Sequence, residues 1–335
     1  MKYPSIPYMG NKQKYAQKIY DAILNDLPAK QERVLVDLFC GGFSISSCFK
    51  LNGWQVISND KNKYVIALLD KVLNQELDIV KCLEWISCKQ FKDITDNPQK
   101  YQEWYVGYVL CVWSFGNNGR HYLFGKAVEE YKRQAHEFIV FGIDNKKYLQ
   151  EYCMKMALEK YGTAGNLELK NLVGATVKDR RLEYRKQLGV WNKIRMADNE
   201  QLEQLEQLQQ LQQLEGLERL EQLERLQQLQ QLQQLQQLET VALTSFSYDK
   251  VTIPDNAVIY LDPPYFKTQE YKEGGFDHTK FWDWVRHKST THKVYVSEYN
   301  APDDFELILK IETRSTLSAR SNICKSVEKL FRIKK

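Results

Sequence analysis

The chain has 335 residues, which is enough for one large or two modest domains with a sizeable hydrophobic core. Its 47 basic and 43 acidic side chains leave a net charge of +4, which is compatible with a nucleic-acid partner but too small to indicate one. The seven cysteines are scattered, without a C-x-x-C pair or a cluster with histidine, so we predict reduced thiols and no metal site. Because the sequence has no signal segment and no run of eighteen apolar residues, we expect a soluble, cytoplasmic protein without a membrane partner.

The first informative segment is Tyr8-Met9-Gly10-Asn11-Lys12, which precedes a predicted helix. Apolar residues recur after it at helical spacing, at Tyr15, Ile19, Ala22 and Ile23. A glycine, an amide and a lysine that lead into a helix offer hydrogen-bond donors to an anion such as a carboxylate. An ordinary turn before a surface helix is the alternative interpretation.

A glycine turn follows the first predicted strand. Residues 34–38 form that strand, Phe39-Cys40-Gly41-Gly42-Phe43 form the turn, and a helix is expected from Ser44. This order is typical of a nucleotide-binding sheet, because glycines let a ligand approach the backbone closely. The turn is neither G-x-G-x-x-G nor a P-loop, and simple packing of the strand on the helix would also explain it.

A second predicted strand, residues 54–59, ends in an acid, Asp60. An acid about twenty residues after the glycine turn suits hydrogen bonds to the ribose hydroxyls of a nucleotide cofactor. Taken alone, Asp60 would more often cap the helix expected at 64–73. The joint spacing favours the ribose role.

Between residues 76 and 195 the alternation of strand and helix gives way to an aromatic, basic and helical composition. Most of the aromatic side chains recur at helical spacing and are assigned to packing. The turn at 116–122 is expected to be exposed and functional, with Asn118, Arg120 and His121 as its polar side chains. A basic stretch at 178–186, which includes Arg180 and Arg181, fits either phosphate contact or a solvated helix face.

Residues 201–239 are of low complexity, with leucine at every third position from Leu202 to Leu238. Leu, Gln, Glu and Arg favour a helix, but a three-residue step falls about 60° short of a full α-helical turn, so the leucines form no single seam. A heptad coiled coil is therefore not predicted. We predict a helical insert that packs on itself or on a partner. A 3₁₀ helix, a solenoid and a repeat without function are the alternatives.

The chemically most specific motif is Asp262-Pro263-Pro264-Tyr265, which follows the apolar run 257–261. This run is expected to be a buried parallel strand. Neither proline can donate a ladder hydrogen bond, so the strand ends and leaves an acid and an aromatic at its carboxyl end, where ligands bind in open α/β sheets. Further strands are predicted at 240–249, 293–299 and 327–333, and a helix or a strand at 305–311.

The order of these motifs resembles the Dam-like (D12 class) adenine-specific DNA N6-methyltransferases. The resemblance covers residues 3–75 and 241–335. One departure is Phe43, which stands where that family usually has the second glycine of F-x-G-x-G, and Gly42 is expected to supply the flexibility instead. The resemblance implies an α/β fold with a Rossmann-like S-adenosylmethionine-dependent methyltransferase sheet formed by 1–75 and 241–335. It also implies a mostly helical DNA-recognition insert at 76–200. The Leu-x-x repeat at 201–239 is a separate insert that is not part of the resemblance.

The resemblance further implies S-adenosylmethionine as cofactor and double-stranded DNA as substrate, in a prokaryotic or phage-encoded protein that works at the nucleoid. The implied cofactor-binding residues are Tyr8, Gly10, Asn11, Lys12, Asp37, Phe39, Gly41, Gly42, Ser44 and Asp60. At the target, Asp262 and the Pro263 carbonyl would accept the amino hydrogens of a flipped-out adenine, Pro264 would hold that carbonyl in place and Tyr265 would stack on the base. The implied DNA contacts are Asn118, Arg120, His121, Arg180 and Arg181. A cognate restriction endonuclease and self-association through the repeat are further expectations.

Two other functions stay open from the sequence. The first is methyl transfer to another planar amino group, namely cytosine N4, RNA adenine or protein glutamine. Asp262 at the head of the tetrapeptide favours DNA adenine over these. The second is a non-enzymatic DNA-binding scaffold organised by the leucine repeat, although every position needed for methyl transfer is filled.

Overall fold

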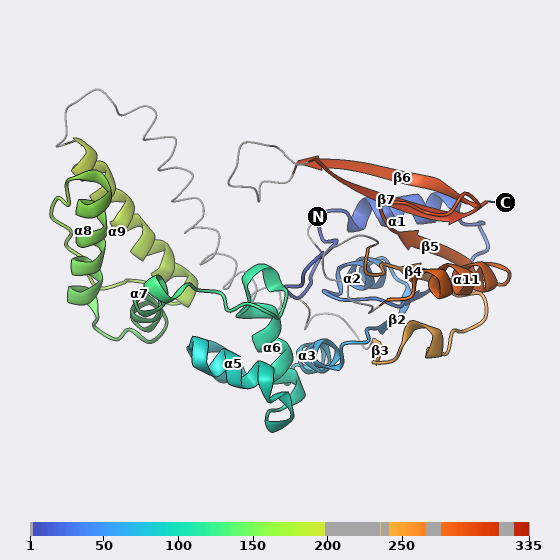
Figure 1. The fold of residues 1–335 in the computed structure, drawn as a ribbon, viewed down its shortest axis with the longest axis horizontal. Coiled ribbons are helices and arrows are strands. Elements are labelled where there is room, and N and C mark those ends of the chain that lie inside the picture. Colours follow the sequence, from blue (N-terminus) through green and yellow to red (C-terminus); the bar gives the residue numbers. More distant parts are fainter. Residues whose placement is uncertain (1–2, 198–234, 236–240, 266–275, 315–324, 335) are drawn as a thin grey trace. The chain divides into compact units, whose positions relative to one another are not determined.

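The computed structural model describes residues 3–197, 235, 241–265, 276–314 and 325–334 (Figure 1). Its contacts divide the chain into two compact units. Unit 1 comprises Met1–Leu77, Ile94–Gly119 and Gln230–Lys335, and unit 2 comprises Asp78–Asp93 and Arg120–Leu229. Apart from Leu235, the Leu-x-x repeat lies outside the described residues, so its predicted helix stays a prediction.

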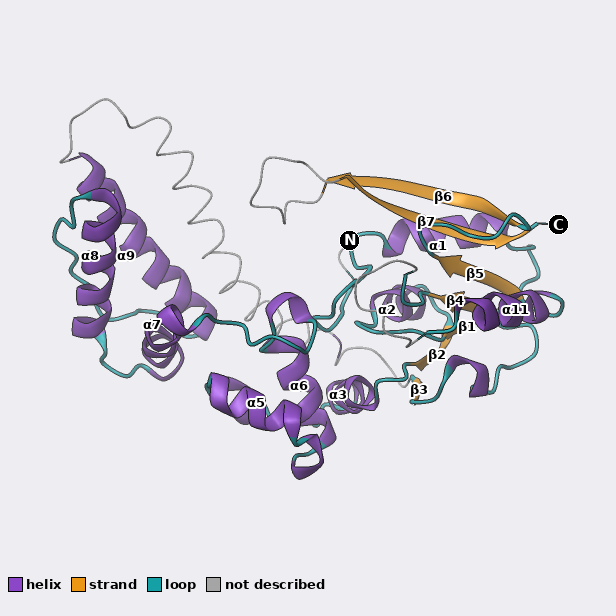
Figure 2. Cartoon of the chain, in the orientation of Figure 1, coloured by secondary structure: helices purple, strands orange, loops and turns teal. Residues whose placement is uncertain are grey.

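Unit 1 is built on a sheet with the strand order β3-β2-β1-β4-β5-β7-β6 (Figure 2). The strands are β1 Val34–Asp37, β2 Gln55–Asn59, β3 Ala242–Thr244, β4 Val258–Leu261, β5 Lys293–Ser297, β6 Phe305–Arg314 and β7 Lys325–Ile333. The strands β3, β2, β1, β4 and β5 run parallel, whereas β7 is antiparallel to both β5 and β6. The predicted α/β class is confirmed. The strand order reverses between β1 and β4, and in open α/β sheets ligands bind at the carboxyl ends of the strands beside such a reversal.

Both faces of this sheet are covered, because successive strand residues point to opposite sides. Leu35 and Tyr295 belong to one core cluster, and their neighbours Val36 and Val296 belong to the other. Helices α1 (Ala16–Asp26) and α2 (Ser44–Leu51) contribute to the first cluster, and α11 (His278–Ser289) contributes to the second. The near-continuous apolar strands of the sequence are explained by this burial on two sides.

Helices α3 (Lys63–Leu73) and α6 (Glu103–Val112) pack closely within unit 1. A β-carbon at Gly107 would lie only 2.1 Å from the carbonyl oxygen of Tyr64, so the two helices approach through the missing side chain. Residues Ile94–Gly119 consequently belong to the unit that holds the sheet. Short 3₁₀ turns lie at Pro98–Lys100, Phe115–Asn117 and Tyr248–Lys250.

Unit 2 is helical where it is described. Its helices are α4 Ile79–Leu83, the first part of α5 Cys88–Asp96, α7 Lys126–His136, a π-helical turn Glu137–Phe141, α8 Lys146–Tyr161 and α9 Val177–Ala197. A core of aromatic and aliphatic side chains holds them together, including Tyr131, Phe138, Leu149, Tyr184 and Trp191. The predicted packing role of most aromatic residues in the middle of the chain is confirmed, as Phe91, Tyr108 and Trp113 are also buried.

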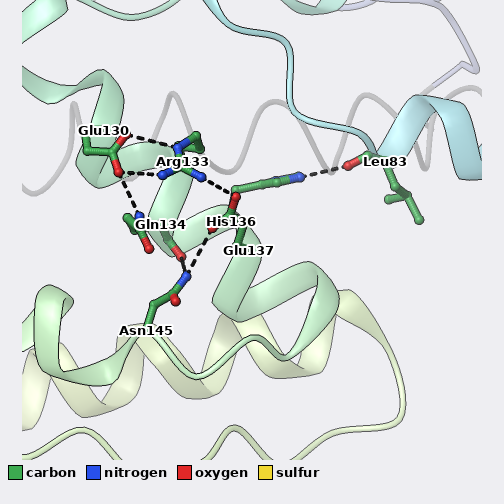
Figure 3. Close-up of polar contacts among 7 residues, drawn as sticks. All are labelled: Leu83, Glu130, Arg133, Gln134, His136, Glu137 and Asn145. Carbon is green, nitrogen blue, oxygen red and sulfur yellow. Dashed lines mark hydrogen bonds and ion pairs between the residues drawn. The ribbon is translucent and has the colours of Figure 1, made fainter.

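A polar network joins the end of α7 to its neighbours within unit 2 (Figure 3). Arg133 pairs with Glu137 at 2.5 Å, and Asn145 donates to the other carboxylate oxygen of Glu137 at 3.2 Å. The His136 ring nitrogen lies 2.8 Å from the Leu83 carbonyl oxygen at the end of α4. These contacts hold the π-helical turn between two helices.

The structure resolves the ambiguities that the sequence left. The segment 305–311, predicted as helix or strand, is part of strand β6. Helix α3 is capped by Asn62, whose side chain accepts from the Tyr64 amide at 3.1 Å, and not by Asp60. Within the described ranges, no helix has the length and apolar character needed to cross a bilayer.

We expect Gly107→Ala to destabilise unit 1 by about 1–3 kcal/mol, because the added methyl group meets the Tyr64 backbone and must push α6 away from α3. Urea unfolding followed by circular dichroism measures this. Gly189→Ala in α9 is the matched control, since nothing lies within 4 Å of its β-carbon position. The control should gain up to about 1 kcal/mol from helix propensity, and equal effects at the two positions would contradict the packing argument.

Candidate active site

The glycine turn lies at the carboxyl end of β1, beside the carboxyl end of β4. The Leu38 amide donates to the Tyr260 carbonyl of β4 at 3.1 Å, and the Cys40 amide donates to the Asn59 carbonyl of β2 at 2.9 Å. The turn therefore leaves the sheet between the two neighbours of β1. This places it at the predicted ligand edge.

The amino-terminal segment is fastened to this turn. The Ile6 amide donates to the Gly42 carbonyl at 2.9 Å, and the Asn11 side chain donates to the Ile6 carbonyl at 3.0 Å. A β-carbon at Gly41 would lie 2.8 Å from the Tyr8 ring, and one at Gly42 would lie 2.9 Å from the Asn11 amide nitrogen. Both glycines are thus required for the close approach of the amino-terminal segment to the turn, and the side chains of Tyr8 and Asn11 pack against the turn.

Phe43 itself takes the left-handed conformation, with φ of 70° and ψ of 11°. Gly41 also has a positive φ, of 42°, whereas Gly42 is absent from the residues with positive φ. The expectation that Gly42 replaces the second family glycine is therefore wrong, because Phe43 adopts the glycine conformation at that position. Its fully buried ring offsets the backbone strain, which for a residue with a β-carbon amounts to about 1–2 kcal/mol.

We expect Phe43→Gly to be more stable than Phe43→Ala by about 1 kcal/mol, although glycine is normally the more destabilising of the two residues. Both variants lose the buried ring and about 3–5 kcal/mol with it, but only alanine keeps the left-handed strain. Chemical unfolding of the two variants measures the difference. An alanine variant at least as stable as the glycine variant would show that the position carries no strain.

Asp60 holds the other side of the turn. Its Oδ2 accepts from the Gly41 amide at 3.0 Å and its Oδ1 accepts from the Asn62 amide at 2.8 Å. Burial raises the pKa of Asp60, and the two amide donors oppose that shift. Each carboxylate oxygen keeps a lone pair for a further donor, so this geometry is compatible with the predicted ribose contact.

Asp37 is buried at the end of β1 with one oxygen satisfied. The Ser46 hydroxyl donates to Oδ2 at 2.7 Å, and Ser58 donates to Ser46 at 2.7 Å. The other oxygen, Oδ1, is buried and has no hydrogen-bond partner among the residues that the structure describes. Burial raises the pKa of Asp37 to about 7, the Ser46 hydroxyl opposes the shift, and the charges of Asp262 and Asp60 add to it.

Asp37→Asn should change how stability depends on pH. The folded-state pKa is raised, so the stabilisation linked to protonated Asp37 is complete below the unfolded pKa of about 4 and is lost as the pH rises through about 7. The asparagine does not ionise, so the variant should gain on the wild type from about pH 5 to 8, by at most about 4 kcal/mol. Melting temperatures of the protein without cofactor test this, with the exposed Asp283→Asn as control. A constant difference across the pH range would contradict it.

The D-P-P-Y motif ends β4 and carries a buried ion cluster. The Lys12 ammonium lies 3.1 Å from Asp262 Oδ2 and 3.4 Å from Glu328 Oε1, with 8% of its side chain exposed. It also lies 4.6 Å from the centre of the Tyr265 ring. The Tyr265 hydroxyl donates to Glu328 Oε1 at 2.6 Å, and the Tyr299 ring packs edge-on against Tyr265 at 4.5 Å.

Electrostatics couple the members of this cluster. Burial raises the pKa of Asp262 and that of Glu328, and the Lys12 charge opposes both shifts. Burial lowers the pKa of Lys12, but the two carboxylates outweigh it, so the pKa ends above its usual value. The ammonium therefore stays charged and keeps the carboxylates close to it.

Comparison with known proteins bears on this arrangement. Residues 8–166 match the family model of the D12 class N6 adenine-specific DNA methyltransferases. The matched range includes the amino-terminal segment, the glycine turn and Asp60, so the resemblance read from the sequence is confirmed there, and it ends before Asp262.

Part of the chain is also similar to a curated methyltransferase. The chain is 41% identical over 78 residues to the Type II methyltransferase M2.HphI of Haemophilus parahaemolyticus. The aligned residues make up 23% of this chain and 22% of the relative, so the chain spans about a fifth of the length of the curated relative that it matches.

The predicted site residues fall into separate places. The structure brings Lys12 to Asp262, and Asp37 and Asp60 to the glycine turn. Ser44 is buried at the first position of α2, Phe39 packs on Tyr248 at 5.6 Å, and Gly10 is exposed with φ of 76°. Pro263 is buried and Pro264 is half-buried.

The predicted DNA contacts differ in exposure. Asn118 is half-buried, and Arg120 and His121 are exposed. Arg180 donates to the carbonyls of Ile139 and Val140 at 2.8 and 2.7 Å. Arg181 is buried, with 6% exposed. Arg180 therefore stabilises the π-helical turn of unit 2, and the predicted phosphate contacts of Arg180 and Arg181 stay a prediction.

Three residues at the site were missed by the sequence analysis. Glu328 lies two residues before the buried Leu330 in β7, so both side chains are on the same face of the strand. A carboxylate on the buried face of a strand is a sequence signal that could have identified Glu328. Tyr299 follows β5 directly, which could have placed it at the ligand edge. Phe246 follows β3, is 55% exposed and exchanges backbone hydrogen bonds with the Asn59 side chain, but a lone aromatic gives no sequence signal.

Proposed function

We propose that this chain transfers a methyl group from S-adenosylmethionine to the N6 amino group of adenine in double-stranded DNA. The observation that carries the proposal is the meeting of the glycine turn of β1 with the Asp262 motif of β4 at the point where the strand order reverses. The match of residues 8–166 to the family model of the D12 class N6 adenine-specific DNA methyltransferases supports it.

The residues beside the turn fit such a cofactor. The unpartnered Oδ1 of Asp37 would be satisfied by a cationic donor such as the ammonium of the methionine end. Asp60 has lone pairs for ribose hydroxyls, and the exposed Phe246 ring, which follows the neighbouring strand, offers an apolar face to an adenine. When bound, the cofactor supplies a methyl group activated by a positively charged sulfur.

The chain's own part in the chemistry is to prepare the target nitrogen. Its lone pair is delocalised into the adenine ring, so the amine is a weak nucleophile. Asp262 and the Pro263 carbonyl would accept its two hydrogens and favour the pyramidal nitrogen that attacks the methyl group. The two prolines restrict the backbone that carries this carbonyl, and Tyr265 offers a ring to a base that has left the duplex.

Charge balance at the cluster suits the transfer. Two carboxylates, Asp262 and Glu328, face one ammonium, Lys12, so an excess of one negative charge is buried when all three groups are ionised. That negative charge would stabilise a positive group beside it. The first such group would be the positively charged sulfur of the bound cofactor, and the second would be the methylated nitrogen before it loses its proton. Asp262, which lies in the motif, is the acceptor for that proton.

We assign recognition of the DNA target to the predicted insert, residues 76–200. Its contacts would be Asn118, Arg120 and His121, because two of these three side chains are exposed. A cognate restriction endonuclease, self-association through the Leu-x-x repeat and action at the nucleoid stay predictions.

The decisive experiment incubates the purified chain with methyl-labelled cofactor and duplex DNA of mixed sequence and identifies the labelled nucleoside by mass spectrometry. We expect N6-methyladenine from the wild type. Label on cytosine N4 would support the other amine chemistry, and absence of label on both bases would refute the proposal.

Asp262→Ala should lower the turnover number by at least about 10²–10³-fold while cofactor affinity stays within a few-fold, because the lost contacts are made to the target amine. Single-turnover rates and calorimetric binding separate the two quantities. The exposed Asp303→Ala serves as control and should behave as the wild type. Full turnover by Asp262→Ala would remove Asp262 from the mechanism.

A further inference from the structure

Glu328 joins three parts of the site through one side chain. Its Oε1 accepts from the Tyr265 hydroxyl at 2.6 Å and lies 3.4 Å from the Lys12 ammonium. Only 12% of its side chain is exposed. Its backbone pairs with Ile311 of β6, whereas these two side-chain partners belong to the D-P-P-Y motif and to the amino-terminal segment.

The direction of β7 explains how this residue reaches the site. Because β7 is antiparallel to β5, its first half lies at the edge where the parallel strands end. Ser297, the last residue of β5, is opposite Leu330, and the Glu298 amide donates to the Lys329 carbonyl at 3.3 Å. Glu328 therefore lies beyond the carboxyl end of β5, beside the extension of β4.

The contacts of Glu328 constrain both groups that the proposed reaction uses. Without its carboxylate, the Lys12 charge would pair with Asp262 alone and compete for the oxygens needed by the target amine. The Tyr265 hydroxyl would also lose its hydrogen bond to Glu328 and keep the one to Asp262, so the ring would be held from one side instead of two. A carboxylate on a separate strand thus fixes the ammonium and the aromatic ring at once.

We propose that Glu328 is a positioning residue for methyl transfer: it anchors the Tyr265 hydroxyl and shares Lys12, so that the Tyr265 ring and the Asp262 carboxylate are held in place for the target base. The proposal rests on the proposed function. It assigns Glu328 no contact with substrate or cofactor, and its effect passes through Tyr265 and Lys12.

Two substitutions of Glu328 separate its contact with Tyr265 from its contact with Lys12. Glu328→Ala removes both, whereas Glu328→Gln keeps the shape and an oxygen that accepts from Tyr265 but loses the charge shared with Lys12. Glu306→Gln is the matched control, because Glu306 lies on β6 of the same hairpin and pairs with Arg332 at 2.8 Å, outside the cluster. Arg332 keeps a second partner, Asp26, in that control.

We expect the turnover number to fall about 100-fold in Glu328→Ala and about 10-fold in Glu328→Gln, with the cofactor KM within about 3-fold of the wild type. Glu306→Gln should retain wild-type turnover. Melting temperatures confirm that each variant is folded, and Glu328→Gln decides the question if Glu328→Ala does not fold. Unchanged turnover in the folded Glu328→Gln and Glu328→Ala variants, or an equal loss in Glu306→Gln, would overturn the proposal.

A double-mutant cycle with Tyr265→Phe measures whether the effects of Glu328 and Tyr265 on turnover are coupled. A purely structural role of Glu328 would not produce such coupling. Tyr265→Phe should lower turnover in the wild type and should have a smaller further effect in Glu328→Ala, since the hydroxyl has then already lost its hydrogen bond to Glu328. Additive losses would overturn the coupling. If the wild type itself transfers no methyl group to DNA, the proposed function fails, whereas turnover by the wild type with an additive cycle refutes only the positioning role.

Discussion

The site depends on a buried ammonium between two carboxylates. Lys12 connects the first segment of the chain, the end of β4 through Asp262 and the carboxyl-terminal hairpin through Glu328. Breaking a buried ion pair by removing one partner costs about 3–5 kcal/mol, because the remaining charge is left uncompensated. The three segments are therefore held in one geometry by charge, even though only Lys12 lies within the range that matches the D12 class. A cluster of this kind lets a loop position catalytic atoms as firmly as a strand.

Much of this arrangement could be predicted from the sequence, because strands and glycine turns leave local patterns. The apolar runs at β1 and β4 and the acids that follow them predicted both the α/β class and the edge at which Asp37 and Asp262 lie. The sequence could not show that Lys12 reaches Asp262, since the two are 250 positions apart in the numbering and only the folded sheet brings them together. It also could not show that Phe43 adopts a glycine conformation, because the compensating burial of its ring is a tertiary effect.

The basic stretch of α9 shows a structural use of arginine that the sequence does not predict. Charge and aromatics alternate there and predict phosphate contacts for Arg180 and Arg181, while in the structure Arg180 donates to two carbonyls of a π-helical turn and Arg181 is buried. A π-helical turn leaves backbone groups without their usual helical partners, and an arginine with its fork of donors can satisfy two carbonyls at once. Sequence alone does not reveal such a demand, since it arises from the local backbone and not from the composition.

The place of β3 in the sheet has a consequence for how this chain can vary. β3 is an edge strand that pairs with β2 alone, and the chain makes its entire excursion through unit 2 and the Leu-x-x repeat between those two neighbours. The entropy of closing such an excursion grows only with the logarithm of its length, about 0.6 kcal/mol for each doubling. Triplets can therefore be gained or lost at little cost to folding, and β1, β4 and the acids at their ends keep their register. The segment between β2 and β3 can thus change in length while the acids at the ends of β1 and β4 keep their positions.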